Sequence, residues 1–255
     1  MSDANVYETP VIEPGMPGLA ENPRSVSIGR GWGWIADGFG HFKQNPGAWI
    51  LTVIVGLVIV IGLSFIPLLG QLALWLTNYV WIAGLMIGCR AQASGGNFEV
   101  RYLFAGFSND RAGSLILLSV IMAILTIVIM VIAIGPVYWE ILKGGSASDQ
   151  ALIESMSDLQ GFWLPFLIGM LFLIPLMMAA WFAPALIALN NVPLFKAMQL
   201  SFIGCAKNIL PFLLYGVAGL ILAILASIPL GLGFLVLGPV LVASIYASYK
   251  EIFTE

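Results

Sequence analysis

Few side chains in this sequence could perform metal, nucleophilic or acid–base chemistry. The 255 residues include one histidine, His41, and two cysteines, Cys89 and Cys205. A metal site needs several such ligands at defined spacing, and Lys207, close after Cys205, is only a weak signal for a reactive thiol. We therefore predict no catalytic residue, no metal site and no cofactor, so that the protein is not an enzyme.

The long apolar stretches contain no charged side chain that could serve chemistry within a membrane. An intramembrane hydrolase needs paired aspartates or a serine with a basic partner, and ion-coupled transport usually requires a carboxylate or histidine at membrane depth. The polar residues that do occur there are uncharged, as are Gln71, Thr77 and Asn78. They are expected to form hydrogen bonds between helices; the alternative is contact with a substrate in a cavity.

The amino-acid composition indicates that the long apolar stretches lie in a lipid bilayer. The chain is 60% hydrophobic and only 9% charged, with a mean hydropathy of +1.00. Soluble domains have roughly 25% charged residues, so the apolar blocks indicate a lipid bilayer. A net charge of −3 gives no footprint for nucleic acid.

Six apolar segments are long enough to cross a bilayer, which takes about 20 helical residues. The sequence therefore predicts an all-α integral membrane protein with six transmembrane helices, arranged as three hairpins. Proline and glycine in "SFIPLLGQ" and "SIPLGLG" indicate a tight reversal within the first and the last hairpin. The predicted spans are 48–66, 69–89, 114–136, 162–188, 209–228 and 230–249.

Basic residues predict the orientation of these spans. Nine of the ten lysines and arginines fall on the side of the membrane that holds both termini, and only Lys143 falls on the other. The positive-inside rule therefore predicts that both termini are cytoplasmic. Residues 1–27 contain four prolines and four acidic residues, so we predict a disordered tail there and a transmembrane domain over 28–255.

A cytoplasmic amphipathic helix is predicted before each hairpin. Apolar residues of 31–43 recur at helical spacing, and the spacing returns before the fifth span and more weakly before the third. The alternative is that each is merely a loop helix that covers the ends of the spans. The three apolar series are Trp32, Ile35, Phe39, Phe42; Phe195, Met198, Phe202, Cys205; and Val100, Leu103, Phe107.

Two groups of residues are candidates for contacts that matter to function. Tryptophan, phenylalanine and lysine at the membrane surface are candidates for contact with membrane lipids or a protein partner: Trp32, Trp34, Phe42, Lys43, Lys196, Phe202 and Lys207. Uncharged polar residues and prolines are candidates for helix packing or for lining a cavity: Gln71, Asn78, Pro175, Pro184 and Pro239. The pair Gly84 and Gly88 is expected to let helices approach closely.

Three stretches resemble an uncharacterised family of proteobacterial multi-pass inner-membrane proteins: "GWGWIADGFGHFKQNPGAW", "WFAPALIALNNVPLFKAMQLSFIGCAKN" and "SIYASYKEIF". The middle stretch is the most specific, with the aromatic-Ala-Pro-Ala signature at 181–185 and a following helix marked by Pro193, Lys196, Ala197, Ser201 and Phe202. Family members often carry histidine or aspartate and glycine where this chain has Asn190 and Asn191. The resemblance implies the bacterial inner membrane and this topology, and it implies no activity.

Two functions fit these features. The first is a non-catalytic membrane scaffold, or an accessory or regulatory protein, which binds a protein partner or a second copy of itself. The alternative is a passive or lipid-directed transporter for an uncharged or amphiphilic substrate. The absence of intramembrane charge favours the first, whereas the repeated units and the mid-span prolines favour the second.

Overall fold

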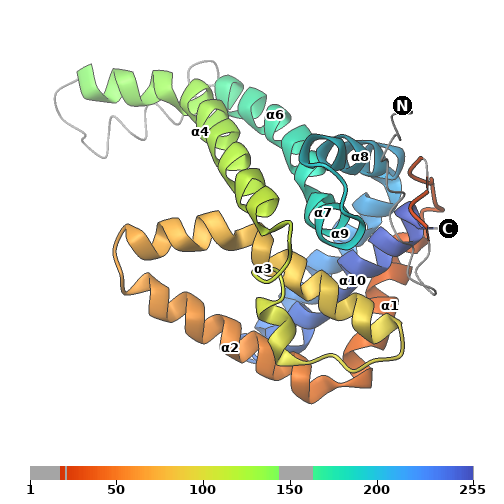
Figure 1. The fold of residues 1–255 in the computed structure, drawn as a ribbon. Coiled ribbons are helices and arrows are strands. Elements are labelled where there is room, and N and C mark those ends of the chain that lie inside the picture. The colour runs from red at the N-terminus through yellow and green to blue at the C-terminus, as the bar shows by residue number, and fades with distance from the viewer. Residues whose placement is uncertain (1–17, 21, 144–162, 255) are drawn as a thin grey trace, which may run out of the picture.

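A computed structural model describes residues 18–20, 22–143 and 163–254 of the protein (Figure 1). Within these residues the regular elements are helices, and the only strand-like pairing is an isolated bridge between Leu19 and Thr254. Six helices are long and apolar enough to cross a membrane. The predicted class, an all-α membrane protein, is thus confirmed.

Each predicted span overlaps one of these helices. The third helix, α4, continues beyond the predicted end at 136, and the start of the fourth span at 162 lies outside the described residues. The elements are α1 (Arg30–Gln44), α2 (Pro46–Ser64), α3 (Leu69–Ala93), the short 3-10 helix η1 (Val100–Phe104), α4 (Ala112–Lys143), α6 (Leu164–Trp181), α7 (Ala183–Asn190), α8 (Leu194–Lys207), α9 (Ile209–Ser227) and α10 (Phe234–Phe253).

Short turns separate α2 from α3 and α9 from α10, where the sequence predicts reversals. The backbone enters the left-handed region at Leu68 (φ 63°) in the first turn and at Leu230 (φ 53°) in the second. Each side chain at these turns is exposed. Beyond the first turn α2 and α3 diverge, as Figure 1 shows, and only 11% of the α2 span is buried within the described residues.

The fourth predicted span is broken into α6 and α7. Pro184 cannot continue the hydrogen-bond ladder of a helix, and the break falls at Phe182. The hydroxyl of Ser201 on α8 enters the gap: it accepts a hydrogen bond from the Phe182 N–H at 2.9 Å and donates one to the Met178 carbonyl at 2.7 Å. Ser201 therefore replaces the backbone bond that a continuous helix would form.

The C-terminal parts of α3, α7 and α10 share one residue pattern and contact one another. In each helix a buried alanine is followed seven positions later by a polar residue: Ala83 by Arg90, Ala183 by Asn190, and Ala243 by Lys250. The Arg90 guanidinium donates to the Leu189 carbonyl at 2.8 Å, and the Tyr249 hydroxyl donates to Asn190. These contacts join the three helices at one end of the bundle.

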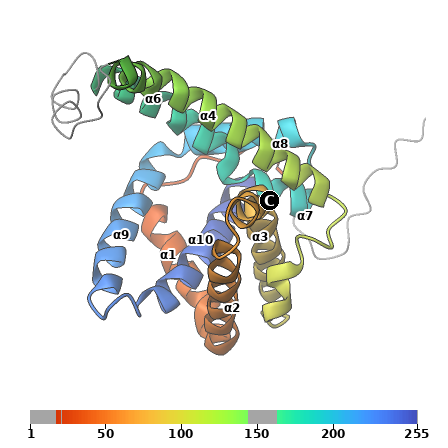
Figure 2. The same cartoon turned by 90° about the vertical axis from the view of Figure 1, so that its left-hand side faces the viewer.

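The element that precedes each pair of spans packs on the second span of another pair. η1 packs on α3, α8 packs on α6, and α1 packs on α10. Figure 2 shows α1 lying between α9 and α10. Glycine permits this contact, because a Cβ on Gly38 would lie only 2.3 Å from the Val240 carbonyl oxygen.

Two details differ from the sequence-based expectation. The segment before the third span is a five-residue 3-10 helix rather than an amphipathic α-helix. Its backbone fits against Gly84, where a Cβ would lie 2.5 Å from the Tyr102 carbonyl oxygen. The Gly84 and Gly88 pair therefore admits a loop rather than another transmembrane helix.

The described residues of the predicted tail, 18–20 and 22–27, differ as well, because they pair with the C-terminal end. The amide of Ala20 donates to the Phe253 carbonyl and the amide of Arg24 to the Ile252 carbonyl, each at 2.8 Å. The buried Asn208 side chain adds two bonds, to the Arg24 carbonyl and from the Val26 amide. These hydrogen bonds hold the segment in place, although it has too few apolar residues to be ordered by burial alone. Residues 1–17 and 21 lie outside the described part.

Candidate functional site

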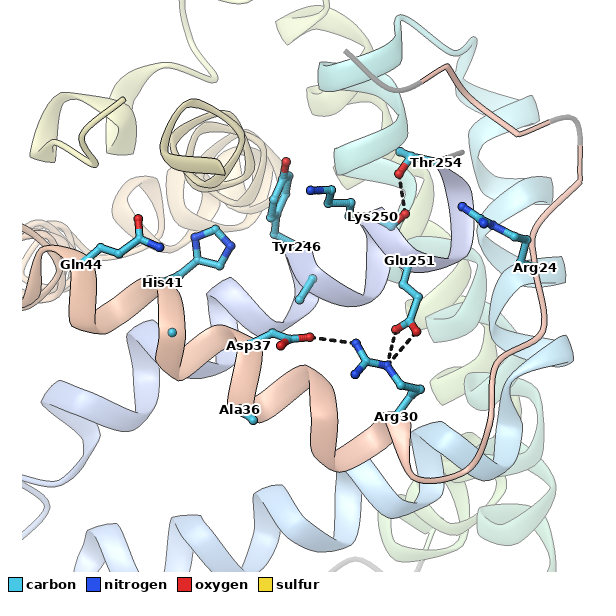
Figure 3. A pocket seen from close by; sticks show the side chains of 12 residues that line it. Arg24, Arg30, Ala36, Asp37, His41, Gln44, Tyr246, Lys250, Glu251 and Thr254 are labelled. Atoms are coloured by element: carbon cyan, nitrogen blue, oxygen red, sulfur yellow. Dashed lines mark hydrogen bonds and ion pairs between the residues drawn. The ribbon is translucent and has the colours of Figure 1, made fainter. Parts of the chain in front are cut away.

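A polar pocket of about 560 Å³ lies between α1, α10 and the N-terminal segment (Figure 3). It is at the end of the bundle where residues 19, 20 and 24 pair with residues 252–254. Its lining includes five charged residues, whereas the linings of the cavities of about 490, 390 and 340 Å³ elsewhere in the described part of the protein include none. Its charged and polar side chains are Arg24, Arg30, Asp37, His41, Gln44, Tyr246, Lys250, Glu251 and Thr254.

An ion-pair network ties α1 to α10 at one wall of this pocket. Arg30 Nε donates to both carboxylate oxygens of Glu251, at 2.7 and 2.9 Å, and Arg30 Nη2 donates to Asp37 at 2.8 Å. The buried Trp34 donates its indole N–H to Glu251 Oε2 at 2.6 Å. Hydrogen bonding to the Glu251 carboxylate, reinforced by Asp37, raises the pKa of Arg30 above its ordinary value. The network therefore keeps a fixed cation and a fixed carboxylate between the two helices.

His41 connects the same pocket to α3. Gln92 donates its amide N–H to the His41 carbonyl at 2.9 Å, and Gln92 Oε1 lies 3.1 Å from His41 Nδ1. Because this amide oxygen can only accept, Nδ1 carries the proton. The imidazole also meets the Tyr246 ring edge-on at 5.8 Å. These contacts give the lone histidine structural partners.

Two cations of the pocket make no hydrogen bond or ion pair through their side chains within the described residues: Arg24 and Lys250. The backbone of Arg24 is anchored on both sides, to Ile252 and to Asn208. In Figure 3 the Lys250 side chain points toward Tyr246, while the Arg24 side chain approaches the end of α10 from the opposite side. The pocket therefore offers two positive charges that no carboxylate of the described residues neutralises directly.

This arrangement suits binding better than bond-making. Glu251 already accepts hydrogen bonds from Arg30 and Trp34, so it is poorly placed to take a proton from a substrate. Cys205 is away from the pocket, on α8, and burial raises the pKa of its thiol to about 12. A thiol with such a pKa is a weak nucleophile near neutral pH. No group of metal-binding side chains occurs among the described residues.

The structure divides the predicted surface residues between two environments. Trp34 and Phe42 are buried in the protein, Trp34 completely, because α1 packs on α9 and α10 instead of lying free on a surface. Trp32 is 53% exposed, and the Lys43 ammonium lies 5.1 Å over the Phe39 ring.

On α8 the predicted apolar series is divided: Phe195 is exposed, Met198 is half-buried and Cys205 is buried. Phe202 and Lys196 are exposed, and the buried side of the helix is formed mainly by small residues such as Ala197 and Gly204. Lys207 is exposed too, but its ammonium donates to the Pro23 carbonyl at 3.0 Å. Lys207 thus fastens the N-terminal segment.

Of the predicted packing or cavity residues, Asn78 lines a cavity. This cavity, of about 390 Å³, lies between α2 and α3 and is otherwise apolar. Gln71 and Pro175 are exposed, Pro175 within α6. Pro184 and Pro239 are buried, at the start of α7 and inside α10.

The sequence analysis did not identify the charged residues that build the pocket. Arg30 and Glu251 are 221 positions apart, so no local spacing signals their contact. Arg24 and Lys250 were recognised only as part of the charge bias. One signal was available: Arg30 and Asp37, seven residues apart, fall on one face of a helix.

A comparison with known proteins finds one relative that is named as a membrane protein. The chain is 27% identical, over 252 residues, to a protein of Burkholderia thailandensis named a probable inner membrane protein; the match covers 89% of this chain and 92% of that protein. No protein-family model matches the chain, and no solved structure matches it. With its six apolar helices, the chain is a multi-pass protein of the bacterial inner membrane.

Proposed function

We propose that the six helices cross the inner membrane as three hairpins, with α1, η1, α8 and both termini on the cytoplasmic side. The excess of basic residues at this end supports the orientation. Pairing of the N-terminal segment with residues 252–254 supports a common side for both termini. The polar pocket then opens toward the cytoplasm.

Within this frame, we propose that the protein is a non-catalytic scaffold or accessory protein that binds a partner helix in the membrane. The observation that carries the proposal is the bare surface of α2. Only Trp49 and Thr52 of this helix are buried, both near its start, and residues such as Val58 and Ile61 are 62% and 49% exposed. A helix packed against the protein near its start, with an apolar surface left exposed along the rest, suits lateral association with another helix.

Site-specific photo-cross-linking in cells tests this role. A photoreactive amino acid at Val58 or Ile61 should form an adduct with one protein, either a specific partner or a second copy of the chain. The same probe at Leu220, which is 63% exposed on α9, is the matched control and should not trap that protein. Adducts with lipid alone at α2, or the same proteins from both helices, would contradict the proposal.

The cavity between α2 and α3 favours a second candidate, a passive or lipid-directed transporter. Asn78 is the one polar side chain among residues that line it, which include Ile59, Leu74 and Trp81. An apolar cavity with one uncharged polar group suits an amphiphile. In proteoliposomes, a transporter should accelerate the movement of labelled lipid between leaflets, and Asn78→Leu should slow it. Equal movement with and without the protein would exclude this candidate.

A further inference from the structure

Two cavities of opposite character flank α1 and share one lining residue. The polar pocket lies along one edge of the helix, and an apolar cavity of about 490 Å³ lies along the other, bounded by α9 and α10. Ala36 lines both. Both volumes fall within the range of about 300–1,000 Å³ that is usual for small-ligand sites. A molecule that is polar at one end and apolar at the other could occupy both.

The charge of the polar side identifies the kind of head group that fits. Arg30 already engages the two carboxylates of the pocket, Asp37 and Glu251. Arg24 and Lys250 remain as cations without a partner in the described chain. Both are exposed and line the same pocket, and one phosphate bound there would form charge-assisted hydrogen bonds with them, which are stronger than bonds between neutral groups.

The apolar side has the features of a lipid contact at the membrane surface. Its α1 wall includes Trp32 and Phe39, which are 53% and 43% exposed, and aromatic side chains are common at the level of lipid head groups. Its far wall is formed by aliphatic residues such as Leu222 and Val236. The Lys43 ammonium lies over the ring of Phe39, one of the lining residues.

Between the two cavities, the exposed surface of α1 is formed by small residues. Ala36 is exposed there, and Gly40 has open space where a Cβ would be. Large side chains at these positions would separate the two cavities. Small ones leave a path over the helix from the apolar cavity to the polar pocket.

We propose that the protein binds one anionic phospholipid astride α1, with its phosphate held by Arg24 and Lys250 and an acyl chain in the cavity between α1, α9 and α10. The apolar cavity, which free phosphate would leave empty, argues for a phospholipid as the source of the phosphate. The site goes beyond the proposed function, because a bound lipid of this kind is compatible with either a scaffold or a transporter.

Native mass spectrometry of the delipidated full-length protein tests the site. Phosphatidylglycerol, phosphatidylcholine and inorganic phosphate are titrated in parallel. One phosphatidylglycerol should bind more tightly than phosphatidylcholine, and the double variant Arg24→Gln/Lys250→Gln should bind it at least about tenfold more weakly. The matched control is Arg101→Gln, which removes an exposed cation outside both cavities.

A second variant tests the path over α1. Ala36→Phe places a bulky side chain on an exposed position between the cavities, so it should weaken binding of phosphatidylglycerol without changing the thermal unfolding temperature. Equal binding by the wild type and the double variant would overturn the proposal. So would equal affinity for inorganic phosphate and phosphatidylglycerol, or lipid binding unaffected by Ala36→Phe. None of these results bears on the cross-linking at α2.

Discussion

Helices α10 and α2 are both apolar enough to cross a membrane, yet the protein buries them very differently. Half of the α10 span is buried within the chain, against 11% of the α2 span. α10 carries small residues, among them Ala243 and Ser244, where α1 approaches, and Glu251 near its end accepts bonds from α1. Most of α2 is aliphatic and has neither feature.

The contrast shows that apolarity selects a helix for the membrane without selecting its protein neighbours. In lipid there is little hydrophobic gain from bringing two apolar helices together, so close packing and polar bonds decide which helices associate. The junction of α1 and α10 has both. The outer part of α2 has neither, and it stays open to lipid or to a partner.

The largest expected effect is a loss of stability on substitution of Trp49, near the packed start of α2, compared with a substitution in the exposed part of the same helix. Trp49 is 1% exposed and stacks on Phe98 with ring centroids 3.6 Å apart. Trp49→Ala should lower the free energy of unfolding in detergent by about 3–5 kcal/mol. Val58→Ala, on the open part of the same helix, should change it by no more than about 0.5 kcal/mol. Similar losses for both would show that the whole of α2 is packed.

A smaller effect tests the close contact of α1 with α10. Gly38→Leu places a side chain against the backbone of α10, and we expect a loss of about 1–3 kcal/mol from overpacking. Gly40→Leu is the matched control, because a Cβ at Gly40 meets nothing within 4 Å; it should be neutral or stabilising, since leucine favours a helix more than glycine does. Thermal unfolding of both variants gives the comparison. A stable Gly38→Leu protein would mean that α1 does not dock on α10.

The smallest expected effect concerns the polar tie between the same helices. Glu251→Gln removes the charge that accepts from Arg30 and Trp34, and it should cost about 1–2 kcal/mol, since the pair is partly exposed. Glu99→Gln breaks a more exposed pair with Arg101 and should change stability by about 0.5 kcal/mol or less. If the two substitutions have equal effects, the network at the pocket is no more than a surface ion pair.

Much of the helical architecture could be predicted from the sequence, since each span is a continuous apolar segment. The break near Pro184 is absent from the predicted span 162–188, because proline can kink a transmembrane helix or end it and the sequence does not say which. Ser201 decides between these outcomes by bonding to Phe182 and Met178. That contact joins residues 19 and 23 positions apart, which no local pattern contains.

The polar pocket also depends on contacts that local sequence patterns do not predict, between residues still farther apart in the chain. Arg30 and Asp37 could be placed on one helix face, but Glu251 enters from the other end of the chain. The described part of the N-terminal segment has the composition of a disordered tail and is nevertheless paired with residues 252–254. Its order comes from bonds with distant partners, which outweigh its own lack of apolar residues.

By itself, the sequence determined that the protein enters a membrane, how many helices are long enough to cross it, and where its charges gather. These properties follow from the free energy of transferring each segment from water to lipid, a sum over neighbouring residues. Only the tertiary structure decided that α1 inserts between α9 and α10, that α2 remains bare and that Arg24, Arg30, Lys250 and Glu251 share one pocket. Those outcomes depend on steric fit and hydrogen bonds between residues far apart in the chain.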